Sequence, residues 1–542
     1  MAETLNAYFI GFDANIANYT STANIDLSHI AVDSTLSLRK SNPIEVCEVL
    51  KGLKPNKATG CDLIPPRLVQ QSAEVLSQPF STLFNYLLDH ATVPSQWKLA
   101  EISPVYKKDC NLTKSNYRPI SILPSLSKVF EKLIHNRVGP YFEDLYHKLV
   151  FAYRKGHGCD TALLSLTEQW RKELDNRRIV GLVSMDLSKA FDMLPHSLII
   201  QKLAKYGADE NTLSLIKDYL TDRKQRVKLA GTFSPWLPVQ RGIPQGSILG
   251  PLLFNIFIND LPHVIDFTIL STYADDTQIF YAGDNVTDVE HAINSDLGKI
   301  DKWYEENEMR RNHDKYKAMV MGKTSRDPVF KCEGTSIPLV EEVELLGVTV
   351  DNKLKFEGQI KKICRKVSQQ IAVLKRMKKL LPLKLRENLY RAFIAPHFNY
   401  CAESWHFCSK RLTEKLEKLN ERALRFVYQD KTSTYEALVV KNGHCSLANQ
   451  RLAKMLSTMF RATGNGNVPS SISELLTARN CNYNLRGDAI LKLPKVNSTK
   501  YGIKSWRYQA ARLWNTIPNY LRNIDTYRSF KRGLKELDLV GL

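Results

Sequence analysis

The pattern of apolar and polar positions predicts strands that end on carboxylates. An apolar run at 179–185 leads directly into Asp186, as a buried strand that delivers its last side chain to the end of a sheet would do. At 267–281, apolar and aromatic residues flank two adjacent acids, a pattern that predicts a β-hairpin with Asp275 and Asp276 at its tip. Three carboxylates are therefore expected at strand ends.

Most of the remaining chain shows helical spacing of its apolar residues. This spacing appears at 68–88, returns at about 197–206 and 211–221, and indicates a buried helix at 248–261. From 357 to about 427 the pattern is helical and basic. Strands mixed with helices in this order predict an α+β fold.

The charge balance indicates a polyanionic partner. The chain has 76 Lys and Arg against 56 Asp and Glu, a formal net charge of +20. The excess lies in two tracts, 353–391 and 479–532, whereas residues 1–50 are acidic. Two separate basic tracts can follow a long nucleic acid, and solvated helix faces are the alternative for either tract alone.

Composition disfavours a secreted, membrane-spanning or zinc-binding protein. The sequence contains no apolar run of about 18 residues and opens on no signal-peptide pattern. Its ten cysteines include no CxxC pair, which suits reduced thiols. The cluster of His397, Cys401, His406 and Cys408 fits no common zinc spacing, so packing in the core is expected, with zinc as the alternative.

The three carboxylates are the kind of ligand that hard divalent cations require. Two Mg²⁺ ions about 3.5–4 Å apart would lower the pKa of an attacking hydroxyl and stabilise a departing pyrophosphate. This chemistry is nucleotidyl transfer. An Asp-Asp pair in a hairpin is by itself usually only a turn, so the surrounding motifs decide between the two interpretations.

Seven sequence blocks occur in a characteristic order before residue 277. They are NKATGCDLIPPRLV (56–69), WKLAEISPVYKK (97–108), NYRPISILPSLSKVFEKLI (116–134), FAYRKGHGCDTAL (151–163), MDLSKAFDMLPH (185–196), GIPQGSILGPLLFNIFINDL (242–261) and YADD (273–276). Together they resemble the reverse transcriptases of non-LTR retrotransposons of the jockey and CR1-like kind. YADD alone would be weak evidence, whereas the ordered set is specific.

The resemblance implies a right-hand polymerase with fingers, a palm with an antiparallel sheet, and a helical thumb. We expect a tether at 1–55, fingers and palm at 56–351, a basic thumb at 352–430 and a mainly helical C-terminal region at 431–542. The thumb would follow the duplex backbone without reading its sequence. In the C-terminal region Trp506, Tyr508 and Trp514 are expected in the core, with stacking on RNA as the alternative. The four domain assignments and the three aromatic assignments rest on the resemblance and on the residue pattern.

The implied activity is that of an RNA-directed DNA polymerase, a nucleotidyltransferase. Its partners would be an RNA template, a DNA primer or target DNA, and deoxynucleoside triphosphates, with two Mg²⁺ ions as cofactors and Mn²⁺ as the alternative metal. The family implies a nuclear and cytoplasmic location. Full-length relatives carry an endonuclease before the polymerase, and 50 tether-like residues are too few for it, so we expect it to be lacking. A catalytically inactive, nucleic-acid-binding relic is the alternative.

The resemblance assigns the metal ligands residue by residue. Asp186 and Asp275 would bridge both ions, Asp276 would complete the triad, and the Leu187 carbonyl would be an additional ligand. The carboxylates should be ionised when metal is bound. Since every carboxylate that the chemistry needs is present, catalysis is the leading interpretation.

The resemblance also implies contacts to the incoming nucleotide. Phe191 would lie beneath the sugar and exclude a ribose 2′-hydroxyl, with a core Phe as the alternative. Gln245 and Gly246 would support the template base and the nucleotide, with a simple helix-entry turn as the alternative. These three residues would set nucleotide selection.

Basic side chains are expected on the triphosphate. Arg118, with Lys107 or Lys108, would reach it from the fingers, and solvated surface is the alternative for the two lysines. Arg offers a bidentate fork, whereas Lys offers a point charge.

Two further assignments complete the predicted site. Lys315 would protonate the pyrophosphate, although its neighbours depart from the family pattern and Lys317 is the alternative. Leu345, Leu346 and Gly347 resemble the primer-grip hairpin, and a core strand describes the two leucines equally well.

Overall fold

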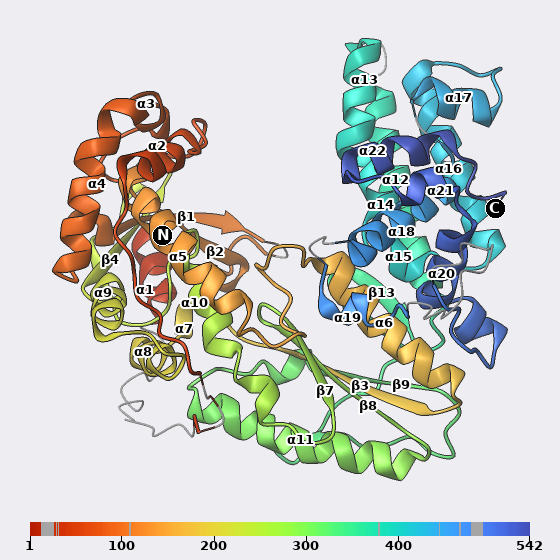
Figure 1. Ribbon diagram of the computed structural model, residues 1–542, viewed down its shortest axis with the longest axis horizontal. Coiled ribbons are helices and arrows are strands. Elements are labelled where there is room, and N and C mark those ends of the chain that lie inside the picture. The colour runs from red at the N-terminus through yellow and green to blue at the C-terminus, as the bar shows by residue number, and fades with distance from the viewer. Residues whose placement is uncertain are drawn as a thin grey trace. The chain divides into compact units, whose positions relative to one another are not determined.

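The chain folds into two compact units. The computed structural model describes residues 1–11, 27–28, 30, 32–107, 110–377, 380–443, 445–464, 468–477 and 491–541 (Figure 1). The first unit comprises Met1–Tyr153, Asp186–Asp266 and Gly298–Asp314, and the second comprises Arg154–Met185, Phe267–Leu297 and Lys315–Leu542. Helices and sheets occur in both, so the predicted α+β class is confirmed.

The first unit is built on a five-stranded sheet. Its order is β2-β1-β4-β5, with β6 paired to β4; β1 and β2 are antiparallel, and β1 and β4 are parallel. These strands are β1 (Leu99–Tyr106), β2 (Tyr117–Ile122), β4 (Arg223–Leu229), β5 (Thr232–Phe233) and β6 (Leu237–Val239). The helices are α1 (Ala2–Phe9), α2 (Pro43–Lys51), α3 (Pro66–Gln71), α4 (Ala73–Asp89), α5 (Ser125–Glu143), α7 (Ala190–Met193), α8 (His196–Lys205), α9 (Glu210–Leu220) and α10 (Leu249–Ile258).

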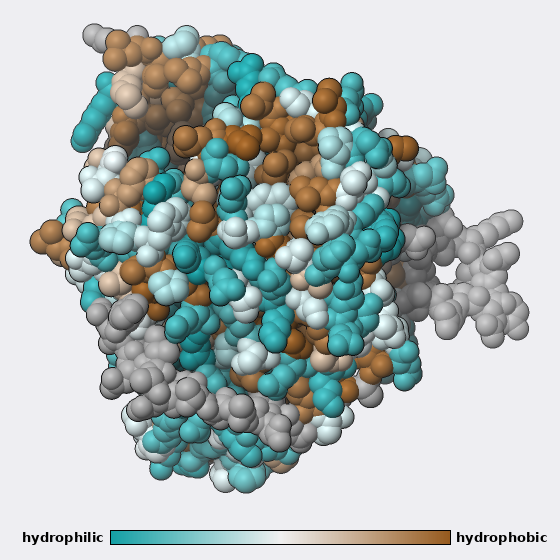
Figure 2. Space-filling model, turned by 90° about the vertical axis from the view of Figure 1, so that its left-hand side faces the viewer, coloured by the Kyte–Doolittle hydropathy of each residue, from teal (hydrophilic) through white to brown (hydrophobic). Residues whose placement is uncertain are grey.

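Several predicted helices of the first unit are confirmed. The spacing at 68–88 corresponds to α3 and α4, and the apolar stretch at 248–261 contains α10, which is buried along nearly its whole length. Helix α4 is amphipathic: it buries Phe80 and Phe84 and exposes Val75 and Tyr86. Figure 2, a view from the side on which α4 lies in Figure 1, shows apolar side chains interspersed among polar ones on this face.

Helix α1 lies within the segment expected to be a tether and was not predicted. Leu5 and Phe9 pack with Ala100, Ile102 and other core residues of the first unit. Asn6 is fully buried, and its amide donates to the Pro235 carbonyl at 3.0 Å. Ser234 and Gln225 also form hydrogen bonds with the Asn6 side chain. The apolar face of α1 is thus interrupted by a buried polar residue whose partners are all distant in sequence, and for this reason the hydrophobic periodicity did not reveal the helix.

The second unit contains a four-stranded sheet of order β7-β8-β3-β9. Helix α6 contributes Trp170 and Leu174 to the core cluster that also includes Val180 of β3 and Met319 of β9. The strands are β3 (Ile179–Asp186), β7 (Ile269–Tyr273), β8 (Asp276–Gly283) and β9 (Lys317–Met321); the adjacent helices are α6 (Cys159–Asp175) and α11 (Val286–Glu306), the latter divided between the two units.

The rest of the second unit is mainly helical. It begins with two antiparallel strand pairs, β10 (Lys331–Cys332) with β11 (Thr335–Ser336) and β12 (Glu342–Leu345) with β13 (Val348–Asp351). The helices are α12 (Glu357–Arg376), α13 (Leu383–Leu389), α14 (Ala395–Asn399), α15 (Ala402–Trp405), α16 (Lys410–Tyr428), α17 (Tyr435–Lys441), α18 (Leu447–Thr463), α19 (Ser470–Ser473), α20 (Trp506–Thr516), α21 (Asn519–Arg522) and α22 (Tyr527–Gly533). In the described part of the chain, no helix has the length and apolar character needed to cross a membrane.

Core packing is confirmed for some of the residues whose role the sequence left open, whereas Tyr508 and His397 are only half-buried. Trp506 and Trp514 belong to one buried apolar cluster, so their rings are not available for stacking on RNA. Cys401 and Cys408 belong to another. His406 is half-buried, its Nδ1 accepts a hydrogen bond from Arg451, and desolvation lowers its pKa to about 3.

A buried carboxyl in this region makes stability depend on pH. Burial raises the pKa of Glu403 to about 7, while its oxygens accept hydrogen bonds from Trp506 Nε1 at 3.0 Å and Thr458 Oγ1 at 3.1 Å. The pKa of this carboxyl is near 4.5 in the unfolded chain and about 7 in the folded protein. At pH values between the two, the folded state binds more protons than the unfolded state, so the free energy of unfolding falls as the pH rises. The free energy of unfolding falls by about 3 kcal/mol across this pH range.

Glu403→Gln should therefore flatten the dependence of stability on pH. The amide can keep both hydrogen bonds but does not titrate, so the variant should be more stable than the parent at pH 8 and lose little between pH 5 and 8. Urea unfolding at the two pH values measures this difference. Exposed Glu536→Gln is the control and should follow the parent. Parallel pH profiles for parent and Glu403→Gln would contradict the prediction.

Candidate active site

The predicted acidic hairpin is present. Strands β7 and β8 are antiparallel with Tyr273 opposite Asp276, which leaves Ala274 and Asp275 as the two-residue turn. Ala274 has a φ of 54°, the left-handed conformation that tight hairpins require. Strand β8 is hydrogen-bonded to β3, whose last residue is Asp186. The three acids thus occupy a turn, a strand start and a strand end of neighbouring strands.

The chain after β3 is fixed by a second segment of the first unit. Asn312 donates its backbone N–H to the Asp186 carbonyl at 3.0 Å, and Leu187 forms an isolated antiparallel bridge with Arg311. The Leu187 side chain is buried. This pairing holds the backbone at the position assigned to the additional metal ligand.

Both candidate proton donors are exposed. Lys315 ends a short 3-10 turn, and Lys317 opens β9 opposite Ser184 of β3. Ser184 lies two residues before Asp186, so Lys317 is near the same end of the sheet. The geometry keeps both lysines as candidates.

Phe191 is held by aromatic packing on α7. Its ring stacks on Phe254 of α10 with centroids 4.5 Å apart and an interplanar angle of 14°, and Tyr153 meets it edge-on at 6.1 Å. Phe191 is only half-buried, so part of its side chain reaches solvent. The ring is therefore neither a fully buried core residue nor a freely rotating surface residue.

Gln245 and Gly246 form a turn locked against β2. The Gln245 carbonyl accepts the Ser121 N–H at 2.7 Å. Gly246 has a φ of 128°, and a Cβ there would lie 2.6 Å from the Ser121 carbonyl oxygen, so only glycine fits. Close backbone approach, which the sequence predicted for this glycine, is thus made to the protein's own strand.

Two carboxylates that support this turn were missed. The Gln245 amide donates to both Asp192 oxygens, at 2.8 and 3.0 Å; burial raises the Asp192 pKa to about 6, and these bonds partly oppose the shift. Buried Glu131 of α5 accepts the N–H groups of Ile248 and Leu249 and so caps the start of α10. Their signals were an acid directly after Phe191 and an acid inside an apolar helical stretch.

The basic side chains that are expected to contact the triphosphate lie on the β1–β2 hairpin. Arg118 is opposite Val105 in the register, and the Lys107 N–H donates to the Asn116 carbonyl at 2.8 Å. Both side chains are exposed and near the same end of the hairpin. Lys108, the alternative to Lys107, lies outside the described residues.

The residues assigned to the primer grip form a second tight hairpin. Leu346 and Gly347 are the turn between β12 and β13, with φ values of 47° and 79°. Leu345 is in the core, as the core-strand interpretation expects, whereas Leu346 is at the tip. Tyr400 Oη donates to the Leu346 carbonyl at 2.7 Å, and Lys362 Nζ donates to the Gly347 carbonyl at 3.2 Å. The tip is therefore anchored on both sides.

A family model described as reverse transcriptase (RNA-dependent DNA polymerase) matches residues 105–350. The chain contains a reverse transcriptase domain. All the predicted site residues, from Lys107 to Gly347, lie within the matched range of this domain.

Curated relatives confirm the predicted resemblance to non-LTR retrotransposon enzymes. The probable RNA-directed DNA polymerase from transposon BS of Drosophila melanogaster is 26% identical over 449 residues, which are 79% of this chain and 49% of that protein. The RNA-directed DNA polymerase from mobile element jockey of the same species is 27% identical over 395 residues, 70% of this chain and 43% of that protein. The chain thus spans about half the length of these relatives.

The assigned acidic metal ligands lie at the end of β3 and in the β7–β8 hairpin of the reverse transcriptase domain. In the part of the chain that the structure describes, no three His, Cys, Asp or Glu side chains are arranged as a ready metal site. Carboxylate and carbonyl oxygens are the hard ligands that Mg²⁺ and Mn²⁺ prefer, so the donor set of Asp186, Leu187, Asp275 and Asp276 fits these ions.

Proposed function

We propose that the chain is an RNA-directed DNA polymerase that extends a DNA 3′-hydroxyl on an RNA template by two-metal nucleotidyl transfer. The observation that carries the proposal is the β7-β8-β3 order, with Asp275 and Asp276 at one hairpin and Asp186 ending the neighbouring strand, inside a reverse transcriptase domain. The relatives named as RNA-directed DNA polymerases support the same activity.

In this proposal Asp186, Asp275 and Asp276 hold two Mg²⁺ ions, with Mn²⁺ as the alternative and the Leu187 carbonyl as an additional ligand. When bound, the ions would activate the 3′-hydroxyl and stabilise the pyrophosphate. Lys315 or Lys317 then donates a proton to the leaving group. The three ionised carboxylates compensate the charge of the cations.

Around this centre, the other residues bind and orient the substrates. Lys107 and Arg118 would contact the triphosphate, where the Arg fork can bind two oxygens at once. The hairpin tip at 345–347 would hold the primer end. Asp192 keeps the Gln245 amide in place through the hydrogen bonds described above, and so orients the turn that faces the nucleotide.

The domain assignments extend this proposal. We assign the fingers and palm to 56–351, the thumb to 352–430 and a helical C-terminal region to 431–542. Within the segment 1–55, which the sequence suggested to be a tether, α1 instead packs into the core of the first unit. The substrates would be an RNA template, a DNA primer or target DNA, and deoxynucleoside triphosphates, in the nucleus and cytoplasm. Amphipathic α12, with its buried apolar stripe and basic last turn, supports a thumb role.

Primer extension tests the proposal directly. The purified chain should extend a labelled DNA primer annealed to RNA when deoxynucleotides and Mg²⁺ are present, and EDTA should stop the reaction. Omission of the template strand is the matched control. Tight binding of the hybrid without any extension would contradict the proposal and favour the inactive relic.

Phe191→Ala should relax the selection of the sugar. Loss of the ring would admit a 2′-hydroxyl, and we expect the preference for deoxynucleotides to fall by about 10- to 100-fold, the range that a change of pocket shape supplies. The ratio of kcat/KM for dCTP and CTP measures this effect. Phe191→Tyr keeps the ring and should keep the preference. An equal loss of rate with both nucleotides would show that the ring only packs against Phe254.

A further inference from the structure

A basic hollow of about 540 Å³ lies in the second unit, away from the acidic hairpin. It is lined by five cationic side chains and Tyr501, and none of the residues that line it in the described chain is acidic. The cations are Arg177, Arg178, Lys323, Lys353 and Lys500. Arg177 and Arg178 directly precede β3, so the hollow is at the opposite end of this strand from Asp186. Eight residues of strand correspond to a separation of roughly 23 Å.

The cations of this basic hollow come from four separate segments. Two follow α6, one follows β9, one follows β13, and Lys500 belongs to the turn at 499–503. Arg178 is paired with Glu173 at 3.2 Å and Asp284 at 3.4 Å. Like charges that converge repel one another, so stability alone does not favour such a cluster without an anionic ligand.

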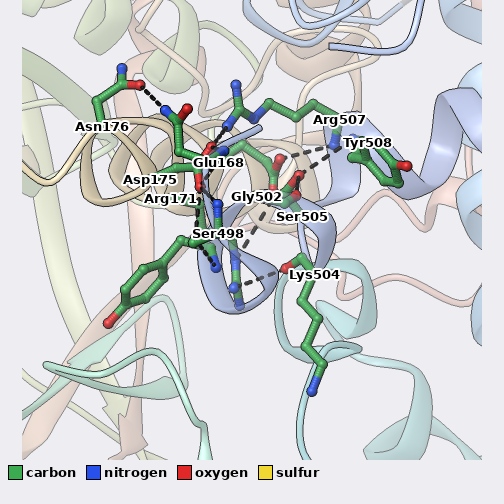
Figure 3. Close-up of polar contacts among 12 residues, drawn as sticks. Glu168, Arg171, Asp175, Asn176, Ser498, Gly502, Lys504, Ser505, Arg507 and Tyr508 are labelled. Carbon is green, nitrogen blue, oxygen red and sulfur yellow. Dashed lines mark hydrogen bonds and ion pairs between the residues drawn. The ribbon is translucent and has the colours of Figure 1, made fainter. Parts of the chain in front are cut away.

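Two buried carboxylates of α6 hold the C-terminal segment that contributes Lys500 to the hollow; Figure 3 shows their contacts. Asp175 accepts the Ser498 N–H at 2.8 Å and the Ser498 hydroxyl at 2.7 Å, and it pairs with Arg507 at 3.3 Å. Glu168 accepts the N–H groups of Trp506 and Arg507, both at 2.9 Å, and so caps α20. The segment between these anchors carries Lys500.

The turn itself is packed tightly against α6. A Cβ at Gly502 would lie 2.7 Å from Asp175 Oδ1, so the backbone touches the buried carboxylate. Lys500 Nζ lies 4.3 Å from the centroid of the Tyr501 ring and donates to its hydroxyl at 2.5 Å. The ammonium group of Lys500 is thereby oriented beside the other cations before any ligand arrives.

We propose that this basic hollow binds the phosphodiester backbone of a single RNA strand, as a site separate from the metal centre. Lys and Arg are the residues that neutralise phosphates. A concave site can surround the backbone of a flexible single strand, whereas duplex phosphates lie on a convex surface. RNA is chosen because the proposed function supplies an RNA strand, so this choice rests on that function.

The test compares two variants that lose the same charge. The hollow variant carries Arg177→Gln, Lys323→Gln and Lys500→Gln, and Lys353 is kept because it belongs to the segment assigned to the thumb. The control variant carries Lys205→Gln, Lys217→Gln and Lys441→Gln, all at exposed positions outside the hollow and outside both basic tracts. Fluorescence anisotropy measures binding of a labelled 20-nucleotide RNA while an unlabelled RNA–DNA hybrid saturates the polymerase channel. The RNA strand of this hybrid extends beyond the DNA 3′ end by a short overhang, so that extension of the DNA can be measured in parallel.

The hollow variant should bind the labelled RNA at least tenfold more weakly than the control. Its slope of log affinity against log salt should fall by roughly 0.7 for each lost phosphate contact. Extension of the hybrid should be the same in both variants. Circular dichroism spectra that match the parent's establish that both variants are folded.

Three results would overturn the proposal: equal RNA affinity in the two variants, displacement of the labelled RNA by the hybrid, or tighter binding of a poly-glutamate peptide than of RNA. These results are independent of catalysis. If the parent fails to extend the hybrid but binds the labelled RNA through the hollow, the proposed polymerase function fails and the binding site stands.

Discussion

Replacing Asp275 with Asn is expected to stop DNA synthesis, with primer extension at least about 10³-fold slower than in the parent. The substitution keeps the shape of the side chain but removes a negative charge that the two proposed metal ions require. A loss of about 4 kcal/mol of transition-state stabilisation corresponds to this factor. Because Asn tolerates turn conformations as Asp does, the β7–β8 hairpin should remain intact.

The matched control for this prediction is Asp284→Asn. Asp284 follows the last residue of β8, and its side chain is 84% exposed, so the same chemical change there should leave extension within twofold of the parent. Single-turnover extension with saturating hybrid separates the chemical step from binding. Undiminished extension by the Asp275 variant would remove this residue from the proposed metal centre.

Asp175→Asn is expected to lower the free energy of unfolding by about 3 kcal/mol, the scale seen when a buried ion pair loses one partner. The Asp175 side chain is 1% exposed and accepts hydrogen bonds from Asn497, Ser498 and Arg507. An Asn in its place has one accepting oxygen, and its amide would face donors. The Arg507 guanidinium, itself only 10% exposed, would also lose its counter-charge.

Urea unfolding followed by tryptophan fluorescence measures the loss, since Trp506 begins the helix that this network holds. Asp525→Asn, at an exposed carboxylate of the same C-terminal region, should leave the midpoint unchanged. The Asp175 variant should also be cleaved faster by trypsin at Lys500 and Lys504. A midpoint equal to that of the control would show that the network contributes nothing to stability.

Local patterns sufficed for the elements whose contacts are close in sequence. The acidic hairpin, α10 and the hairpin at Leu346 were predictable because turns and apolar runs fix them over a few residues. Their positions within the reverse transcriptase domain followed from the order of the motifs. Metal coordination by the acidic triad stays a prediction, because no local pattern determines how distant carboxylates converge.

The features that the sequence did not reveal depend on long-range partners. Asn6 is polar, yet it is buried because a carbonyl more than 200 positions away accepts its amide proton. Glu131 interrupts the apolar stripe of α5 in order to cap α10. Asp192 is an unremarkable acid until the Gln245 amide is placed beside it. In each case a hydrogen bond with a distant group offsets the desolvation cost of burying a polar side chain.

The attachment of the C-terminal segment to α6 also determines when the second unit can finish folding during translation. Asp175 and Ser498 are 323 positions apart, so most of the second unit leaves the ribosome before this contact can form. Until then, the Glu168 and Asp175 carboxylates are exposed to solvent or accept hydrogen bonds from other N–H groups. A nascent chain should therefore gain its final resistance to proteases only after residue 498 has left the ribosome, and chains terminated before residue 497 should be degraded faster by cellular proteases.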